Sequence, residues 1–177
     1  MEELTPAVEK FILHWGELGT RWGLNRTVAQ IHALLYLSPE PLPADQIAKL
    51  LSVARSNVST SLRELQNWGI VRVVHVLGDR RDHFESLKDV WELFSIILEE
   101  RKRREIDPTM AVLQQCAEDL AKGGAEDAYA LTRVREMQGF FQSVLSLYQD
   151  LRRLPTATIR RAIKVKSKLL QVVGTAS

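Results

Sequence analysis

The sequence has little of what marks secreted, membrane-spanning or metal-binding proteins. It contains a single cysteine, Cys116, in 177 residues, which excludes an intrachain disulfide and a zinc site built from several cysteines. No apolar stretch approaches the length of a membrane span, and the start Met1-Glu2-Glu3 lacks the basic and apolar parts of a signal peptide. We therefore expect a cytoplasmic protein with no membrane partner and no metal site. Cys116 is expected to be buried as a small hydrophobic residue, with a redox-sensing thiol as the alternative.

The motifs of common enzymes are also absent. There is no phosphate-binding glycine loop, no GxSxG, no HExxH and no Cys–His pair. The four histidines are scattered over separate predicted elements, namely His14, His32, His75 and His83. We expect no enzymatic activity, no catalytic residue and no cofactor.

Charge is nearly balanced overall but unevenly distributed along the chain. The formal net charge is +2, which is too small for a general polyanion binder. Residues 101–104 form a basic run, residues 105–150 are acidic, and residues 155–177 contain five Lys or Arg and no acid. Such blocks indicate charge placed for a partner or, at residues 101–104, only the solvated end of a helix.

Two short helices are predicted between residues 45 and 68. The first covers residues 45–51, residues 52–54 form a tight turn, and the second runs over residues 55–68 and ends at Gly69. Its apolar stripe, at i, i+4 and i+7, consists of Val58, Leu62 and Leu65. This arrangement predicts a helix-turn-helix.

A β-hairpin is predicted directly after the helix pair. Residues 70–76 are β-branched, Gly78-Asp79 is a turn signal, and residues 83–85 begin the return strand. A helix-turn-helix followed by such a hairpin is a winged helix-turn-helix, which binds duplex DNA through its second helix and its wing.

The predicted DNA-binding residues are side chains that can donate to phosphate oxygens and base edges. The two arginines at the wing tip suit the minor groove, although a charged hairpin tip can also be merely solvated. The predicted set is Arg55, Ser56, Asn57, Ser59, Thr60, Arg63, Arg80 and Arg81.

Four stretches between residues 23 and 108 carry a family resemblance. In order, they are GLNRTVAQIHALLYL, VARSNVSTSLRELQNWGIVR, GDRRDHFE and DVWELFSIILEERKRREIDP. This part of the chain resembles the GbsR-type branch of the MarR-like winged-helix regulators. The resemblance implies a dimeric prokaryotic transcription regulator whose second helix enters the major groove, and some members sense choline or glycine betaine. The chain departs from the pattern at Ala54 and Pro43, which stand where Ser or Thr often caps a helix, and at four positions of residues 25–33, namely Asn25, Ala29, Gln30 and Ala33.

The remainder of the chain is predicted to be helical. Asp107-Pro108 is expected to end one helix and to begin the next, and a long helix is predicted over residues 125–153. A final amphipathic helix is predicted after Pro155. In the long helix, apolar residues recur at alternating spacings of four and three, as at the a and d positions of a coiled coil. Packing against the final helix would explain this pattern, but we favour a dimer interface formed by Val134, Met137, Phe141, Val144, Tyr148 and Leu151.

Four aromatic residues suggest a ligand pocket. Trp15, Trp22, Tyr36 and Trp91 could enclose a quaternary ammonium by cation–π attraction. The alternative, ordinary core packing, is the commoner role of aromatic residues at helical spacing, and aromatic residues make up only 7% of the chain.

The predicted fold is mainly α, with two parts. Residues 1–86 hold N-terminal helices and a winged helix-turn-helix DNA-binding domain, and residues 87–177 form a long-helix C-terminal dimerisation and regulatory region. The predicted function is sequence-specific binding of double-stranded DNA at a pseudo-palindromic operator by a homodimer. We expect a transcriptional repressor. A small-molecule effector of unknown identity is a possible further partner, and the sequence does not show whether one exists. The alternative is a winged helix that docks proteins, but such modules lose the basic residues that this chain keeps.

Overall fold

The computed structural model describes residues 3–154, 157–158 and 161. The chain divides into two compact units, Met1–Ile97 and Leu98–Ser177. Within the described ranges, no helix combines the length and the apolar character needed to cross a membrane. Apart from residues 157–158 and 161, the predicted final amphipathic helix lies outside the described residues.

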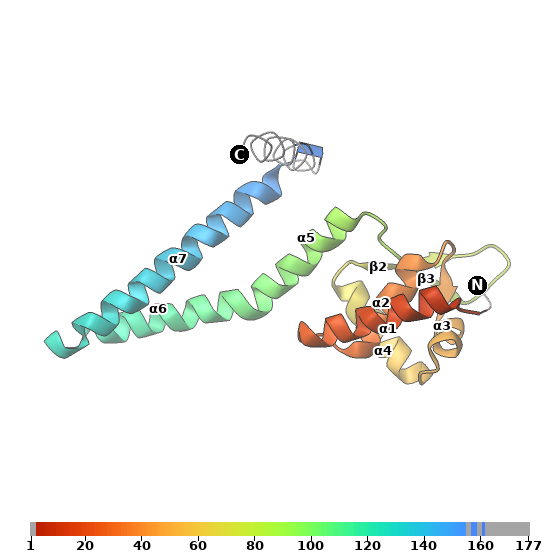
Figure 1. The fold of residues 1–177 in the computed structure, drawn as a ribbon, viewed down its shortest axis with the longest axis horizontal. Coiled ribbons are helices and arrows are strands. Elements are labelled where there is room, and N and C mark those ends of the chain that lie inside the picture. The colour runs from red at the N-terminus through yellow and green to blue at the C-terminus, as the bar shows by residue number, and fades with distance from the viewer. Residues whose placement is uncertain (1–2, 155–156, 159–160, 162–177) are drawn as a thin grey trace, which may run out of the picture. The chain divides into compact units, whose positions relative to one another are not determined.

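The first unit is a helical domain with one small sheet (Figure 1). Its elements, in order, are α1 (Pro6–Arg21), α2 (Arg26–Leu37), β1 (Leu42–Pro43), α3 (Ala44–Leu51), α4 (Arg55–Asn67), β2 (Val71–His75), β3 (Asp82–Ser86) and the start of α5 (Val90–Arg101). Helices α3 and α4 with the β2–β3 hairpin confirm the predicted winged helix-turn-helix, and the mainly α fold class is confirmed as well. The two-residue strand β1 was not predicted, because it is too short to show a period.

Local chemistry explains where these elements begin and end. The side chain of Asn25 accepts from the backbone N–H of Thr27 at 2.8 Å and so caps α2. Ser52 ends α3 with a left-handed φ of 53°, which lets the chain turn sharply into α4. Gly69 has a φ of 75°, which glycine adopts without a steric penalty, and it separates α4 from the wing.

The sheet orders its strands β1-β3-β2, all antiparallel. Phe84 of β3 pairs with Leu42 on one side and with Val73 on the other. The core lies between this sheet and the helices, and its side chains are almost completely inaccessible. Its largest members include Ile31, Leu34, Leu35, Ile47, Val58, Leu62, Leu65 and Ile70. The predicted stripe of α4 is therefore confirmed as core.

The second unit is a helical hairpin. After the end of α5 come a π-helical turn (Lys102–Ile106), α6 (Asp107–Ala121), a 3₁₀ turn (Ala125–Asp127) and α7 (Ala128–Arg153). The predicted break at Asp107-Pro108 is wrong, since no residue outside a helix separates α5 from α6. The wider π-helical turn directly before Pro108 accommodates a ring that would clash in a regular helix, as well as its missing N–H.

Helices α6 and α7 pack against each other through a partly polar seam. Gln138 is buried on α7, and its side-chain amide donates to Gln114 of α6 at 3.1 Å. Nearer the start of the unit, the Tyr148 hydroxyl donates to the Glu99 carboxylate at 3.2 Å, and Arg152 pairs with the same carboxylate. Such polar contacts fix the position of α7 along α6 and along the end of α5 but bury little apolar surface.

Candidate nucleic-acid interface

Helix α4 has one buried and one exposed face. Val58, Leu62 and Leu65 face the core, so that the other side of the helix is open to solvent. The structure places all six predicted residues of this helix in exposed positions on it. They are Arg55, Ser56, Asn57, Ser59, Thr60 and Arg63. None of the six is acidic, and no described carboxylate forms an ion pair with Arg55 or Arg63, so this face can donate many hydrogen bonds to an anionic partner.

The N-terminus of α4 adds backbone donors to this face. Ala54 is the N-cap and has no side chain that can accept a hydrogen bond, as the sequence indicates. The first backbone N–H groups of a helix have no partner within the helix, and they carry the positive end of its dipole. A phosphate oxygen is a suitable acceptor at such a position.

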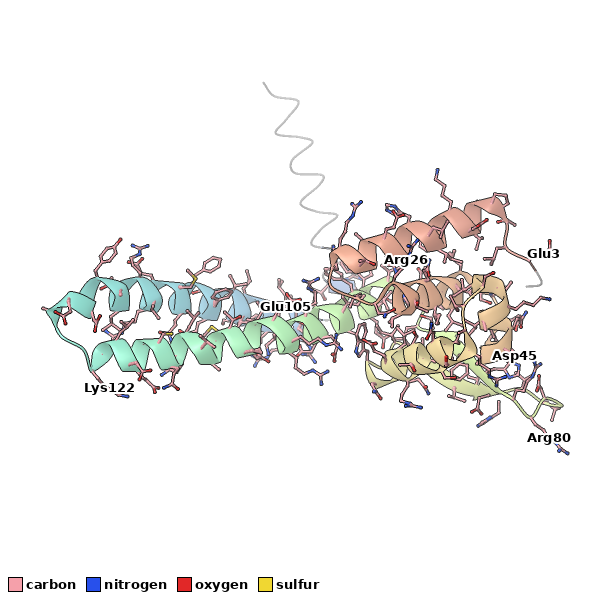
Figure 2. All side chains as sticks on the ribbon, turned by 90° about the horizontal axis from the view of Figure 1, so that it is seen from below. Glu3, Arg26, Asp45, Arg80, Glu105 and Lys122 are labelled. Atoms are coloured by element: carbon pink, nitrogen blue, oxygen red, sulfur yellow. The ribbon has the colours of Figure 1, made fainter. Side chains whose placement is uncertain are left out.

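The wing presents its two arginines differently. Arg80 is exposed, has no ion pair among the described residues, and lies at the outer end of the wing loop (Figure 2). Arg81 is paired twice, with Asp79 at 2.5 Å and with Asp45 of α3 at 2.8 Å. The hydrogen bonds from Arg81 hold the pKa of the Asp79 carboxyl well below its usual range. Only one of the two wing arginines therefore carries an uncompensated charge.

Sequence reasoning missed two contacts that support this surface. It did not pair Asp45 with Arg81, which lies 36 residues later, and no local pattern signals such a contact. It also missed Lys88, whose ammonium donates to the carbonyls of Leu35, Tyr36 and Ser38 at 2.7–2.9 Å. This lysine caps the C-terminus of α2 and ties it to the end of the wing.

An apolar cavity lies behind this surface, inside the first unit. Its volume is about 130 Å³, and it is bounded by Trp15, Leu18, Gly19, Trp22, Leu24, Val28, Ala29, His32, Leu65, Trp68, Ile70, Phe94 and Ile97. A second apolar cavity of about 230 Å³ also contacts His32 and Trp15. No described carboxylate or lysine lines either cavity.

His32 is the polar residue shared by the two cavities. It is 5% exposed, and its Nδ1 accepts a hydrogen bond from the Trp15 indole N–H at 3.3 Å. Because Nδ1 is an acceptor, the neutral ring carries its proton on Nε2, which has no partner among the described residues. Burial and then the charge of Lys88 lower the pKa of His32 to about 4, so the ring is neutral near pH 7.

The four aromatic residues predicted to form a pocket are only partly brought together. Trp15 and Trp22 line the smaller cavity, Trp15 and Tyr36 line the larger one, and Trp91 lines neither. A cation already lies over one of these rings, since the Lys88 ammonium is 5.9 Å from the centre of Tyr36. The four predicted aromatic residues therefore do not form one common cage.

The predicted interface residues of α7 fall on two faces. Val134, Phe141 and Tyr148 are half-buried within the second unit, whereas Met137, Val144 and Leu151 are exposed. Phe140 and Leu147 are exposed as well. An apolar row with spacings of three and four residues thus remains open on α7, and we call Met137, Phe140, Val144, Leu147 and Leu151 the open row.

The second unit also contains Cys116 and the basic run of residues 101–104. Cys116 is exposed on α6, so its predicted burial is wrong, because the two-helix hairpin offers too little covering structure. The basic run is neutralised locally, with Arg101 paired to Glu105, Lys102 to Asp107, and both Arg103 and Arg104 to Glu100. This supports the interpretation of the run as a solvated helix surface.

Comparisons with known proteins agree with this geometry. Residues 22–82, which hold the helix-turn-helix and most of the wing, match the model of the MarR family. This segment of the chain is therefore similar to the MarR-type winged helix. The crystal structure of a transcriptional regulator superposes on it with a TM-score of 0.62, covering 82% of this chain and 95% of that chain at 22% identity.

Among curated proteins, the MarR-like chain is similar to the HTH-type transcriptional repressor GbsR of Bacillus subtilis. The two are 23% identical over 101 residues. The match covers 57% of this chain and 56% of the relative, so the chain spans little more than half the length of that protein. The resemblance to the GbsR-type branch is thereby confirmed.

Proposed function

We propose that this MarR-like protein is a sequence-specific DNA-binding transcriptional regulator, and specifically a repressor. The exposed face of α4 carries the proposal, because it offers forked and hydroxyl donors without a single acid among its six predicted residues. The similarity to the GbsR repressor supports regulation of transcription. Helix α4 enters the major groove, where Arg63 and Asn57 can reach base edges while Ser and Thr hydroxyls reach phosphates. The wing flanks it at the minor groove.

The experiment that tests this function is selection of preferred duplexes from a random DNA pool, followed by titration of binding against salt. A pseudo-palindromic motif and an affinity that falls steeply with salt are expected, since Lys and Arg contacts release counterions from the duplex. Without an enriched motif, and with weak, salt-insensitive binding, the protein-docking alternative would replace the proposal.

The regulator acts as a homodimer in this proposal. A two-fold dimer presents two recognition helices about 34 Å apart, one turn of duplex DNA. The open row of α7 supports such an assembly, because exposed apolar residues repeating every three and four positions are typical of a helix–helix interface. Of the predicted interface residues, Met137, Val144 and Leu151 lie in this row. Val134, Phe141 and Tyr148 support it from inside the unit.

Light scattering on two matched variants tests the dimer. The double substitution Phe140→Glu with Leu147→Glu adds two charges to the open row and is expected to give a monomer. The control, Gln142→Glu with Gln149→Glu, adds the same charges at exposed positions on another side of α7 and is expected to remain a dimer. A monomeric wild type, or a dimeric double variant of the open row, would contradict this interface.

The smaller of the two cavities that contact His32, of about 130 Å³, is the proposed effector site. Its walls are apolar, and His32, which lines it, has an Nε2–H without a partner among the described residues. We infer that the cavity suits an uncharged, largely apolar molecule with one hydrogen-bond acceptor better than a quaternary ammonium. Titration of small uncharged aromatic ketones against choline, followed by tryptophan fluorescence, tests this preference. Tighter binding of choline would favour the cation–π site instead.

A further inference from the structure

We propose that Asp45, Asp79 and Arg81 form a latch that holds the wing against α3, and that Arg80 alone is the DNA-contacting cation of the wing tip. This inference rests on the proposed function. It assigns a structural role to Arg81 and a DNA-contacting role to Arg80, two neighbouring arginines that the sequence alone does not distinguish.

The contacts of Arg81 carry the first step. Its Nε donates to both carboxylate oxygens of Asp79 at 3.0 Å, and its Nη1 donates to Asp45 at 2.8 Å. Its backbone N–H also donates to Asp79 at 3.0 Å. A guanidinium held by a bidentate pair and by a second carboxylate is fixed in orientation. Releasing it toward a phosphate would leave two carboxylates without their cation.

Local charge gives the second step. Arg80 and Arg81 contribute two positive charges to the tip, and Asp45 and Asp79 contribute two negative charges. The latch by itself is therefore net negative, and Arg80 supplies the remaining attraction for DNA. Figure 2 shows Arg80 at the outer end of the loop and Asp45 at the start of α3.

The position of the latch explains why the wing needs it. The loop between β2 and β3 contains Leu77, which is fully exposed, and Gly78, whose φ is 86°, so the loop buries little of its own surface. Asp45 lies in the first turn of α3, and α3 packs directly on α4. The ion pair between Arg81 of the loop and Asp45 of α3 thus fixes the wing tip relative to α4.

The loop is further supported at its base by a histidine. His83 is buried, its ring lies 3.0 Å from the carbonyl of Arg81, and its Nε2 lies 3.5 Å from Asp79. These contacts hold the backbone of Arg81 in place while its side chain reaches Asp45. The latch is therefore anchored on β3 through His83 and on α3 through Asp45.

Substitution of Asp45 distinguishes a latch from a direct contact. If Arg81 bound DNA, Asp45→Asn would free it and remove a negative charge, and affinity would rise. The latch predicts that Asp45→Asn weakens binding of the selected duplex about threefold to tenfold with an unchanged salt slope. Arg80→Ala is expected to reduce the salt slope by about one. The matched control is Glu85→Gln, which removes one carboxylate from the wing but not from the latch, and it is expected not to weaken binding.

Arg81→Lys provides a rescue test. Lysine keeps the charge but cannot form the bidentate pair, so the salt slope should be kept while affinity falls about as much as in Asp45→Asn. Wild-type affinity in Arg81→Lys would indicate a simple phosphate contact and would overturn the latch.

Hydrogen exchange of residues 76–82, measured without DNA, separates failure of the latch from failure of the proposed function. Faster exchange is expected in Asp45→Asn and Arg81→Ala, and wild-type exchange in Arg80→Ala. Wild-type exchange in all three variants would overturn the latch, as would unchanged or tighter DNA binding by Asp45→Asn. If the wild type bound no duplex, the proposed function would fail and the exchange data alone would decide the latch.

Discussion

The two units of the chain differ in how far each can satisfy its own apolar surface. In the first unit, side chains such as Ile31, Leu34 and Ile47 have essentially no solvent exposure. In the described part of the second unit, Ala117 is the one buried hydrophobic residue, and five large apolar residues of the open row are exposed. A layer of helices and a sheet closes around a core, whereas two helices alone cannot.

The difference in apolar burial matches the different roles proposed for the two units. The first unit has a core that specifies one arrangement of α4 and the wing, which a DNA-reading surface requires. The described part of the second unit exposes an apolar face, the open row of α7, and an exposed apolar face of this kind marks an interaction surface. The following substitutions test whether the contrast holds.

The largest effect is expected from Leu34→Ala in the first unit. Leu34 is completely buried, so its truncation removes apolar contacts and leaves a cavity, at a cost of about 2–5 kcal/mol in the free energy of unfolding. Urea unfolding followed by circular dichroism measures this. The matched substitution is Leu147→Ala, of a side chain that is 61% exposed, measured at low protein concentration, where it should cost less than about 0.5 kcal/mol. Equal costs at the two positions would remove the contrast.

A second test uses pH, because all four histidines belong to the first unit. Burial lowers the pKa of His32 from 6.5 to about 4, so between these pH values the unfolded chain binds a proton that the folded chain does not. The free energy of unfolding should therefore fall as the pH is lowered from 6.5 to 4, by up to about 3 kcal/mol from this residue.

The contribution of His32 can be isolated by comparison with an exposed histidine. Urea unfolding at several pH values should show that His32→Gln loses most of this pH dependence, while His14→Gln, at an exposed position of α1, keeps it. The same pH dependence in both variants would mean that burial does not shift the pKa of His32 between the unfolded and the folded chain.

The sequence predicts the elements of the first unit better than the faces of the helices in the second unit. Apolar spacing and turn residues identified the helix-turn-helix, the hairpin and the core stripe of α4, because local pattern and tertiary packing agree there. The heptad of α7 was harder to interpret, since one apolar helix can face its own neighbour and a partner at once, and Phe141 and Val144 proved to lie on different faces. Contacts between distant charges, such as Arg81 with Asp45, have no sequence signature. Cys116 was misjudged because burial depends on how much structure covers a helix.

Arginines in the two units should differ in their effect on DNA binding. Arg63 is exposed on α4 without an ion pair among the described residues, and Arg63→Ala is expected to weaken binding to the preferred duplex by about 1–3 kcal/mol if it contacts a base. Arg103 of the second unit is paired with Glu100 at 2.6 Å, and Arg103→Ala should leave affinity unchanged. Fluorescence anisotropy at fixed salt measures both. Equal losses would mean that the basic run also contacts DNA.

The smallest effect is expected at the start of α4, where Ala54→Ser should stabilise the first unit by about 0.5–1 kcal/mol. A serine hydroxyl would accept from a backbone N–H that Ala54 leaves to solvent, as Asn25 does at the start of α2. Urea unfolding of Ala54→Ser and of Asn25→Ala should give changes of opposite sign and similar size. If Asn25→Ala destabilises while Ala54→Ser gains nothing, then the free N–H groups of α4 cost the fold nothing. The absence of a cap would then leave them available to a phosphate without a loss of stability.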